Sequence, residues 1–397
     1  MTDQDQAQQL AAGAAAGLTR REFIPRAVAA LMGVGALLNP RWLLAGAARD
    51  RAGAEGMKYR ILGKTGIKVS TIGFGSHVSE ELLANPLARA SHIRRGLELG
   101  INLFDVYDHD FHQFAPMGQI LGPVRQQVVI SLVAVWNQSQ VRQEVEYALK
   151  TFATDYIDLY RIYVDTGTSA EEMEVRFQAL QQAKKEGKIR AVGLVAHDHV
   201  LLAQTLRTYP QLDYLMLPYN FRHQKFAPVA EVQPRSRVQA KAEVEAARSA
   251  PAPENLQHLD GISRASSVDC LYSPCSDPEL LPLVRQTGVG LIAIKPFAAG
   301  GLLQLGWSDP LVAQGLAQTG LSLPQAALRF VLDSPEVASV IPAMNSLNEV
   351  AENTGAVRGE GLSRAETELL QQWSEAAERA HGAYLPAKYA WLEQWTA

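Results

Sequence analysis

One short stretch of the chain, FDVYDHDFHQF at residues 104–114, gathers acids, histidines and a tyrosine that could do chemistry. Carboxylates and imidazoles transfer protons near neutral pH when their surroundings tune their pKa values. His109 and His112 are also three residues apart, a spacing that suits two metal ligands on one helical turn. The stretch therefore predicts either an acid–base site or a site for a metal such as zinc.

Other polar residues repeat this placement along the chain. Six of the nine histidines follow segments that we expect to be strands, and tyrosines and acids stand at the same ends. Parallel strands of a barrel bring their carboxyl ends to one mouth, where barrel enzymes carry their active sites. We expect His199 and His223 to be solvated loop residues. The full set is His77, Asp105, Tyr107, Asp108, His109, Asp110, His112, Tyr163, Asp165, His197, His199 and His223.

The elements that would position these groups alternate regularly. Continuous apolar runs predict strands covered on both faces, as in a parallel sheet. Helical patterns lie between the runs, and glycines at 187 and 288 are predicted helix stops. Eight strand–helix units favour a closed (β/α)8 TIM barrel. The predicted strands are 71–75, 102–105, 128–135, 157–164, 191–196, 214–217, 290–295 and 339–341, and the helices 91–99, 139–151, 171–186, 200–207, 278–286, 323–331 and 347–353.

One connection departs from this regularity. Residues 222–268 are polar and charged with no strand pattern, and they follow the sixth predicted strand. We expect a long insertion there, on the same face as the polar ring, because loops of this length are usually functional or disordered. Cys270 and Cys275 come just after it, and we predict a local disulfide between them if the chain works in an oxidising compartment.

Composition excludes one class of function. The chain has 397 residues, is 47% hydrophobic and 20% charged, and carries a net charge of −4. These values are ordinary for a soluble globular protein, and no basic stripe points to nucleic acid.

The first 56 residues do not fit the barrel pattern. Arg20-Arg21 precedes Phe23-Ile24 and an apolar run from Ala27 to Leu38, and the small residues Ala45-Gly46-Ala47 follow. This order is typical of a twin-arginine export signal, so we expect a periplasmic or other extracytoplasmic protein. An uncleaved signal would tether it to the membrane.

Residues 57–397 resemble the aldo/keto reductase family, with collinear matching segments. KYRILGKTGIKVSTIGFG (58–75) is similar to the family's opening hairpin and first strand, and GINLFD (100–105) to its second strand. Further matches are DYIDLYRIYVD (155–165), GKIRAVGLVAHD (187–198), DYLMLPYN (213–220), LIAIKPFAAGGLL (291–303) and IPAMNSLNEVAEN (341–353). The resemblance implies a TIM barrel with an amino-terminal hairpin, and hydride transfer from a nicotinamide to a carbonyl.

The resemblance also implies four catalytic positions, three of which are changed in this chain. The aspartate is retained as Asp105, where either a catalytic role or a buried hydrogen-bonding role is consistent with the sequence. The tyrosine position falls on Asp110, or on His109 or Phe111 after a slip of one residue. The lysine position is Val133, and the histidine position is Tyr163.

Of the NADP site that the resemblance implies, this chain keeps residues at the phosphate and adenosine end but not at the nicotinamide end. Val195, Ala196 and Met216 stand where side chains usually hold the carboxamide, and Ile294 stands in place of a stacking aromatic residue. Residues that match the phosphate and adenosine end are Lys295, Gly300, Gly301, Ser346, Glu352 and Asn353.

Three interpretations remain consistent with these residues. The first is a divergent oxidoreductase-like protein outside the cytoplasm that does not perform ordinary NAD(P)H-dependent carbonyl reduction. In it, Asp105, Tyr163, His109 and Asp110 form a rebuilt site for a small molecule. The second is a non-catalytic subunit that binds a protein partner or a membrane complex. The third is a metal-dependent enzyme whose ligands include His109 and His112. We take the first as our prediction.

Overall fold

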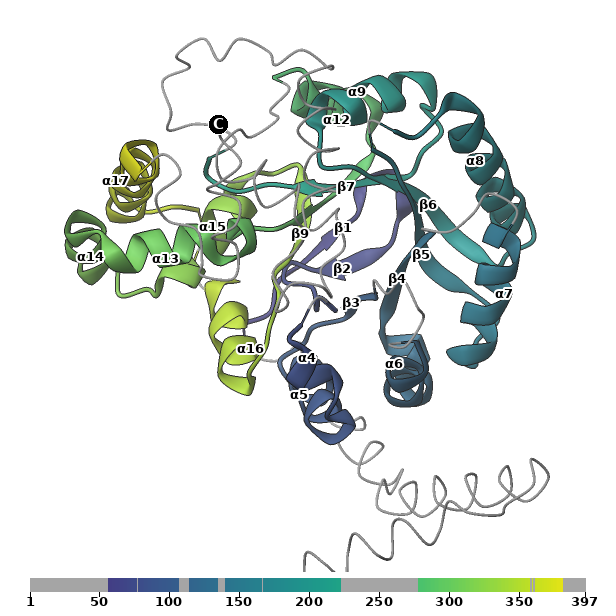
Figure 1. The fold of residues 1–397 in the computed structure, drawn as a ribbon, viewed down its shortest axis with the longest axis horizontal. Coiled ribbons are helices and arrows are strands. Elements are labelled where there is room, and N and C mark those ends of the chain that lie inside the picture. The colour runs from purple at the N-terminus through teal and green to yellow at the C-terminus, as the bar shows by residue number, and fades with distance from the viewer. Residues whose placement is uncertain are drawn as a thin grey trace, which may run out of the picture. The chain divides into compact units, whose positions relative to one another are not determined.

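Seven parallel strands form the central sheet of the protein, in the order of the chain. The computed structural model describes residues 56–76, 78–106, 114–134, 140–165, 167–222, 278–357, 359 and 361–380. Figure 1 looks down the barrel formed by these strands, with helices around it. The strands are β3 (Leu103–Val106), β4 (Val129–Ala134), β5 (Ile157–Tyr163), β6 (Ile189–Val195), β7 (Tyr214–Pro218), β8 (Gly290–Ile294) and β9 (Val337–Ile341).

The first predicted strand closes the gap between β9 and β3. Ile72 bridges Val340 and Phe74 bridges Phe104, both in parallel orientation. The Phe74 backbone N–H donates to the Leu103 carbonyl at 2.8 Å. All eight predicted strands therefore take part in the barrel, and the predicted TIM-barrel fold is confirmed.

Helices lie outside the strands, and the seven predicted helices are all present. α5 begins at Pro86, earlier than predicted, because the Asn85 side chain caps it by accepting from the Ala88 backbone N–H at 3.0 Å. The described helices are α4 (Glu80–Leu83), α5 (Pro86–Glu98), α6 (Phe114–Leu121), α7 (Val141–Thr151), α8 (Ala170–Lys185), α9 (His199–Thr208), α12 (Leu280–Thr287), α13 (Gly301–Ser308), α14 (Pro310–Ala317), α15 (Leu323–Asp333), α16 (Leu347–Thr354) and α17 (Arg364–Ala380). The sequence patterns did not predict α4, α6, α13, α14 or α17.

A hairpin closes the amino end of the barrel. β1 (Tyr59–Ile61) and β2 (Lys68–Ser70) pair antiparallel. Leu62, Ile67 and Val69 belong to the same buried cluster as the inward side chains of the barrel. The fit is close at Gly290, where an added Cβ would lie 2.5 Å from the Leu62 side chain. The absence of a side chain at Gly290 therefore allows the hairpin to pack against the end of the barrel.

Several predictions concern segments outside the described residues. These are the export signal, most of the 222–268 insertion and the Cys270–Cys275 disulfide. Within the described part of the chain, the helices are all too short or too polar to cross a membrane.

Candidate active site at the barrel mouth

Asp105, the retained catalytic position, is buried in an ion pair inside the barrel. Its Oδ1 lies 2.6 Å from Nη1 of Arg161, and its Oδ2 accepts from Nη2 at 3.1 Å. The Ser131 hydroxyl also donates to Oδ1, at 2.7 Å. Bidentate pairing of this kind fixes both side chains. The structure thus places Asp105 in a buried hydrogen-bonded ion pair, and its catalytic role stays a prediction.

Arg161 comes from the middle of β5, at an inward position. It also donates to Ser131 Oγ at 2.8 Å and to the Leu132 carbonyl at 3.2 Å. Burial alone would lower the pKa of Arg161, but the Asp105 carboxylate raises it above the ordinary value. The guanidinium therefore stays charged, and the pair is neutral as a whole.

Tyr214 completes this interior cluster. Gly193 on β6 is the register neighbour of both Arg161 and Tyr214. A Cβ at Gly193 would lie 2.3 Å from the Tyr214 ring, so the ring occupies the space over the glycine. The Tyr214 hydroxyl faces Arg161 and Ser131, and burial raises its pKa well above the ordinary value. This hydroxyl stays protonated at neutral pH.

Above the cluster, the next inward layer toward the mouth is apolar. Val133, the lysine position, is buried in the common core cluster. Val195 and Met216, the carboxamide positions, are buried in the same cluster and are register neighbours. Ile294 packs against them and is partly buried. These side chains offer no hydrogen bond to a nicotinamide carboxamide, so the residues present do not fit that end of the cofactor.

Tyr163, the histidine position, lies at the carboxyl end of β5 and is half-buried against this layer. Its ring meets that of His197 edge to face, with centroids 6.0 Å apart. Arg176 on α8 donates to the Tyr163 carbonyl at 3.3 Å. Tyr163 and His197 thus form an aromatic pair at the carboxyl ends of β5 and β6.

Two other polar residues of the predicted ring serve the local structure. The expectation that His199 is a solvated loop residue is wrong: it is buried at the start of α9, and its Nε2 lies 2.8 Å from the Pro218 carbonyl. The Asp165 carboxylate accepts from the Gly167 N–H at 2.9 Å, which shapes the turn before α8.

The remaining catalytic and metal predictions cannot be placed. His109, Asp110 and His112 lie outside the described residues, as do His77 and His223. Among the residues that are described, histidines, cysteines and acids nowhere form a group of three that could hold a metal. The metal site stays a prediction.

The predicted cofactor residues after β8 lie in a strained segment. Lys295 has a φ of 52° and Ala298 a φ of 46°, a left-handed conformation that non-glycine residues rarely adopt. Gly300 has a φ of 95° and precedes Gly301, where α13 begins. Strain of this kind often marks functional loops. The role of this segment in binding a cofactor stays a prediction.

The predicted cofactor residues after β9 lie at the start and in the last turn of α16. The Ser346 hydroxyl caps α16 by accepting from the Glu349 N–H at 3.1 Å, and the Glu349 carboxylate accepts from the Asn345 N–H at 2.7 Å. Glu352 and Asn353 lie in the last turn of α16, and Asn353 is 2% exposed. β9 neighbours β8, so both segments lie at the same barrel end, and their role in binding a cofactor stays a prediction.

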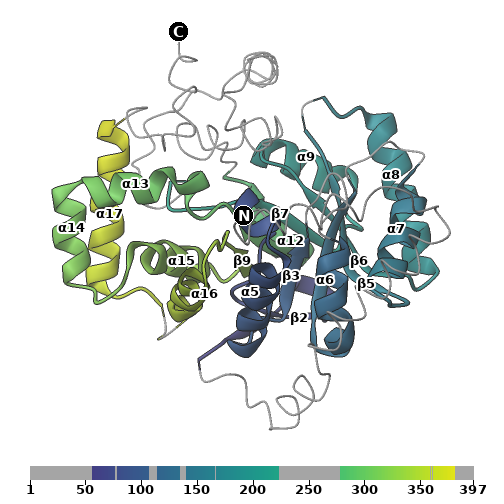
Figure 2. The same cartoon turned by 60° about the horizontal axis from the view of Figure 1, so that its bottom comes forward.

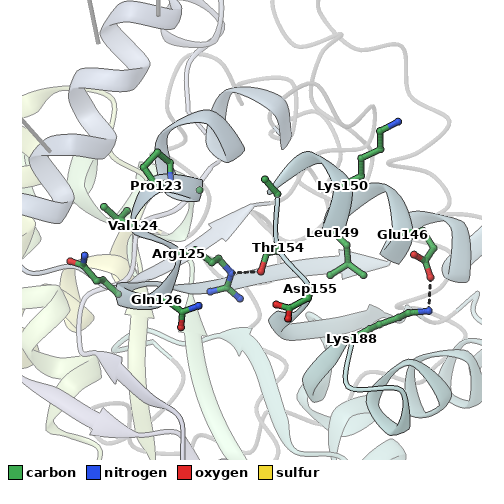
Figure 3. A pocket seen from close by; sticks show the side chains of 13 residues that line it. Pro123, Val124, Arg125, Gln126, Glu146, Leu149, Lys150, Thr154, Asp155 and Lys188 are labelled. Carbon is green, nitrogen blue, oxygen red and sulfur yellow. Dashed lines mark hydrogen bonds and ion pairs between the residues drawn. The ribbon is translucent and has the colours of Figure 1, made fainter. Parts of the chain in front are cut away.

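A groove of about 1030 Å³ lies at the opposite end of the barrel, among residues that precede β4, β5 and β6. Arg125 forms part of its wall (Figure 3) and donates to the Thr154 hydroxyl at 3.1 Å. Lys188 there is paired with Glu146 at 2.6 Å. Barrel enzymes carry their active sites at the carboxyl ends of the strands, which is the other end of the barrel. We therefore assign this groove no catalytic role.

The sequence reasoning missed Arg161, Ser131 and Tyr214. A signal was present, because Arg161 stands in the strand IDLYRIY two residues before Tyr163, on the face that is otherwise formed by Ile157, Leu159 and Tyr163. In a strand, residues two apart share one face. An arginine on the inward face needs a buried anion, and Asp105 was the retained acid.

Known proteins are similar to this chain in sequence. The model of the aldo/keto reductase family matches residues 74–233 and 243–375. The chain is 24% identical to L-galactose dehydrogenase of Arabidopsis thaliana over 333 residues, which cover 76% of this chain and 88% of that protein. It is 20% identical to the uncharacterized oxidoreductase YqkF of Bacillus subtilis, with coverages of 79% and 96%.

Solved structures support the fold. The aldo-keto reductase AKR11C1 from Bacillus halodurans, in its holo form, superposes with a TM-score of 0.53 at 21% identity. The match covers 84% of this chain and 99% of that one.

Proposed function

Because the chain belongs to the aldo/keto reductase family, we propose that it is a divergent oxidoreductase-like protein that does not perform ordinary NAD(P)H-dependent carbonyl reduction. One observation carries this proposal: the Asp105 carboxylate is already neutralised by Arg161, one layer below the mouth. In the family's scheme the aspartate and a lysine act on the proton-donating tyrosine. Here Val133 stands in place of the lysine, so no cation at this position lowers the pKa of a proton donor.

The mouth layer supports the same proposal from the side of the cofactor. The family implies NADP, but Val195 and Met216 have no hydrogen-bonding group for its carboxamide. A buried amide without partners costs free energy on binding. We therefore propose that NADPH, if it binds through the segments after β8 and β9, is held weakly and without a fixed nicotinamide.

Titration of the purified protein with NADPH, followed by fluorescence, tests this proposal. We expect no saturation at micromolar concentrations, and a dissociation constant in the micromolar range or tighter would overturn the proposal. In a Val195→Ser/Met216→Gln variant the lost hydrogen-bonding groups return, and we expect affinity to rise about tenfold. Val200→Ser is the matched control, because Val200 is exposed on α9, and it should leave affinity unchanged.

A second candidate is a binding role without chemistry. The apolar mouth layer favours an uncharged ligand, which would contact the half-buried Tyr163 and Ile294. Turnover assays with small aldehydes and ketones separate the two candidates. Measurable turnover that is lost in Tyr163→Phe would support a rebuilt active site, whereas absence of turnover together with ligand binding would support a binding barrel.

We further propose that the protein acts outside the cytoplasm. The Arg20-Arg21 pair and the apolar run that follows it support this proposal. Fusing residues 1–56 to a reporter enzyme tests it: export should occur, and Arg20→Lys/Arg21→Lys should stop it. Export that persists in this variant would contradict the twin-arginine route.

A further inference from the structure

The surface formed by α13 and α14 is almost free of charge. Between Lys295 and Arg329 the chain contains one charged residue, Asp309. Its carboxylate accepts from the Leu311 N–H at 2.9 Å and the Val312 N–H at 3.2 Å, which caps α14. About a quarter to a third of the residues on an ordinary protein surface are charged. The outer face of these two helices therefore differs from an ordinary solvated surface.

Two large apolar side chains are exposed where α13 meets α14. Trp307 is 62% exposed and Leu311 is 53% exposed. Pro310, Ala313 and Ala317 of α14 are exposed as well, beside the uncharged side chains of Gln314 and Gln318. We call this set the α13–α14 patch. An exposed apolar patch without charge is typical of a docking site.

The inner faces of the same helices are already packed against α17. An added Cβ at Gly306 would lie 2.8 Å from the Trp373 ring, and one at Gly315 would lie 3.3 Å from the Leu369 side chain. Trp373 Nε1 also donates to the Leu302 carbonyl at 2.9 Å. Figure 2 shows α13, α14 and α17 grouped on one side of the barrel. Only the outer face of this group is available for a further contact.

The chain continues from α17 with a segment of matching composition. α17 ends at Ala380, seven residues and about 10 Å of helix beyond Trp373. Residues 381–397 read HGAYLPAKYAWLEQWTA and contain four aromatic rings but two charged side chains. Such a segment gains from burying its apolar side chains. Its first residue follows directly on the helix that packs beneath the patch.

We propose that residues 381–397 dock on the α13–α14 patch of the same chain. Tryptophan and tyrosine supply large contact areas, which suits Trp391 and Trp395 to a surface centred on Trp307 and Leu311. An extended chain of this length spans up to about 56 Å, so its reach is sufficient. Direct attachment to α17 also gives the segment a high effective concentration at the patch.

Photo-crosslinking of the full-length protein tests this proposal. p-Benzoylphenylalanine is introduced at Leu311, and its crosslinks are mapped by mass spectrometry in a mixture of isotopically heavy and light chains. We expect crosslinks to residues 381–397 within one chain. The matched control is the same substitution at Leu87, which is 70% exposed on α5. It should give no crosslink to this segment.

Each other outcome overturns the proposal. Crosslinks between heavy and light chains would assign the patch to a second copy, and absence of crosslinks to 381–397 would leave the segment undocked. Hydrogen exchange gives an independent readout: a chain that ends at Ala380 should exchange the amides of α14 about tenfold faster than the full chain. Unchanged exchange in α14 would contradict docking, and α5 serves as the internal reference.

Discussion

Two buried arginine–aspartate pairs each have one member on strand β5, and they differ in their surroundings and in their number of partners. Asp158 faces the surrounding helices and pairs with Arg125 at 2.7 Å, whereas Arg161 faces the barrel interior and pairs with Asp105 at 2.6 Å. The outer pair lies at the amino end beside the groove of Figure 3. The inner pair lies where the family's chemistry is expected.

The outer pair has more partners than the inner one. Asp158 also pairs with Arg190 at 2.6 Å and accepts from the Ile130 N–H at 3.0 Å. Arg125 additionally donates to the Val128 and Tyr156 carbonyls and stacks 4.0 Å over the Tyr156 ring. Loss of one member of the outer pair therefore leaves the other member partnered. The inner pair is a one-to-one balance of charge in a closed space, where loss of a member costs more.

The largest expected effect is on the inner pair. Arg161→Met should lower the free energy of unfolding by about 3–5 kcal/mol, because Asp105 is then buried without a cation. Urea denaturation measures it. Asp105→Leu/Arg161→Met removes both charges and should recover most of the loss. A double variant as unstable as the single one would show that packing, and not charge, dominates at this site.

Breaking the outer pair should cost less. Arg125→Met should destabilise the protein by about 2–3 kcal/mol, because buried acceptors lose a donor while Asp158 keeps Arg190. The side chain of Arg190 is 47% exposed, so Arg190→Met serves as the control and should cost less than about 1 kcal/mol. An Arg125 variant that is less stable than the Arg161 variant would reverse our ranking of the two pairs.

A third variant tests the packing around the inner pair. Gly193→Ala should cost about 1–3 kcal/mol, because the new methyl group meets the Tyr214 ring. The penalty should largely vanish in a Tyr214→Val background. Gly122→Ala is the matched control, since its nearest neighbour would be 3.5 Å away. Equal effects at the two glycines would mean that helix or strand propensity, and not the ring, sets the cost.

The smallest effect extends the comparison to a pair on the helical periphery, Glu366 and Arg329. Burial alone would raise the pKa of Glu366, but hydrogen bonds from Arg329 and Ser363 lower it below the ordinary value of 4.5. A lowered folded-state pKa means that this contribution to stability is present above pH 4.5 and is lost as the pH falls below it. Glu366→Gln should flatten the acid limb of a stability-against-pH curve. An unchanged acid limb would exclude this pair as a contributor.

Much of the fold could be predicted from the sequence because its signals are local. Continuous apolar runs marked all eight strands, and Gly187 and Gly288, with φ values of 77° and 65°, ended helices as expected. α13 and α14 were missed because their sequences are apolar on more than one face, which removes the amphipathic period. α5 was predicted too short because Asn85-Pro86 was not recognised as a cap and first turn.

The site was predicted in part. Asp105 and Tyr163 were placed correctly at strand ends, and the changed positions Val133, Val195 and Met216 were found in the inward layer that the resemblance implied. His199 was wrong because a histidine after a strand was taken as exposed, whereas a cap at Asp198 turns it inward at the start of α9.

The sequence by itself determined the order of the strands and the family resemblance, because each depends on neighbours within a few positions. Only the tertiary structure showed which cation pairs with Asp105. Its partner Arg161 lies 56 residues away, and parallel register across β3, β4 and β5 brings the two side chains into the same interior space. Whether a buried charge is balanced depends on side chains from different strands that face the same interior space. A local sequence pattern therefore does not predict it.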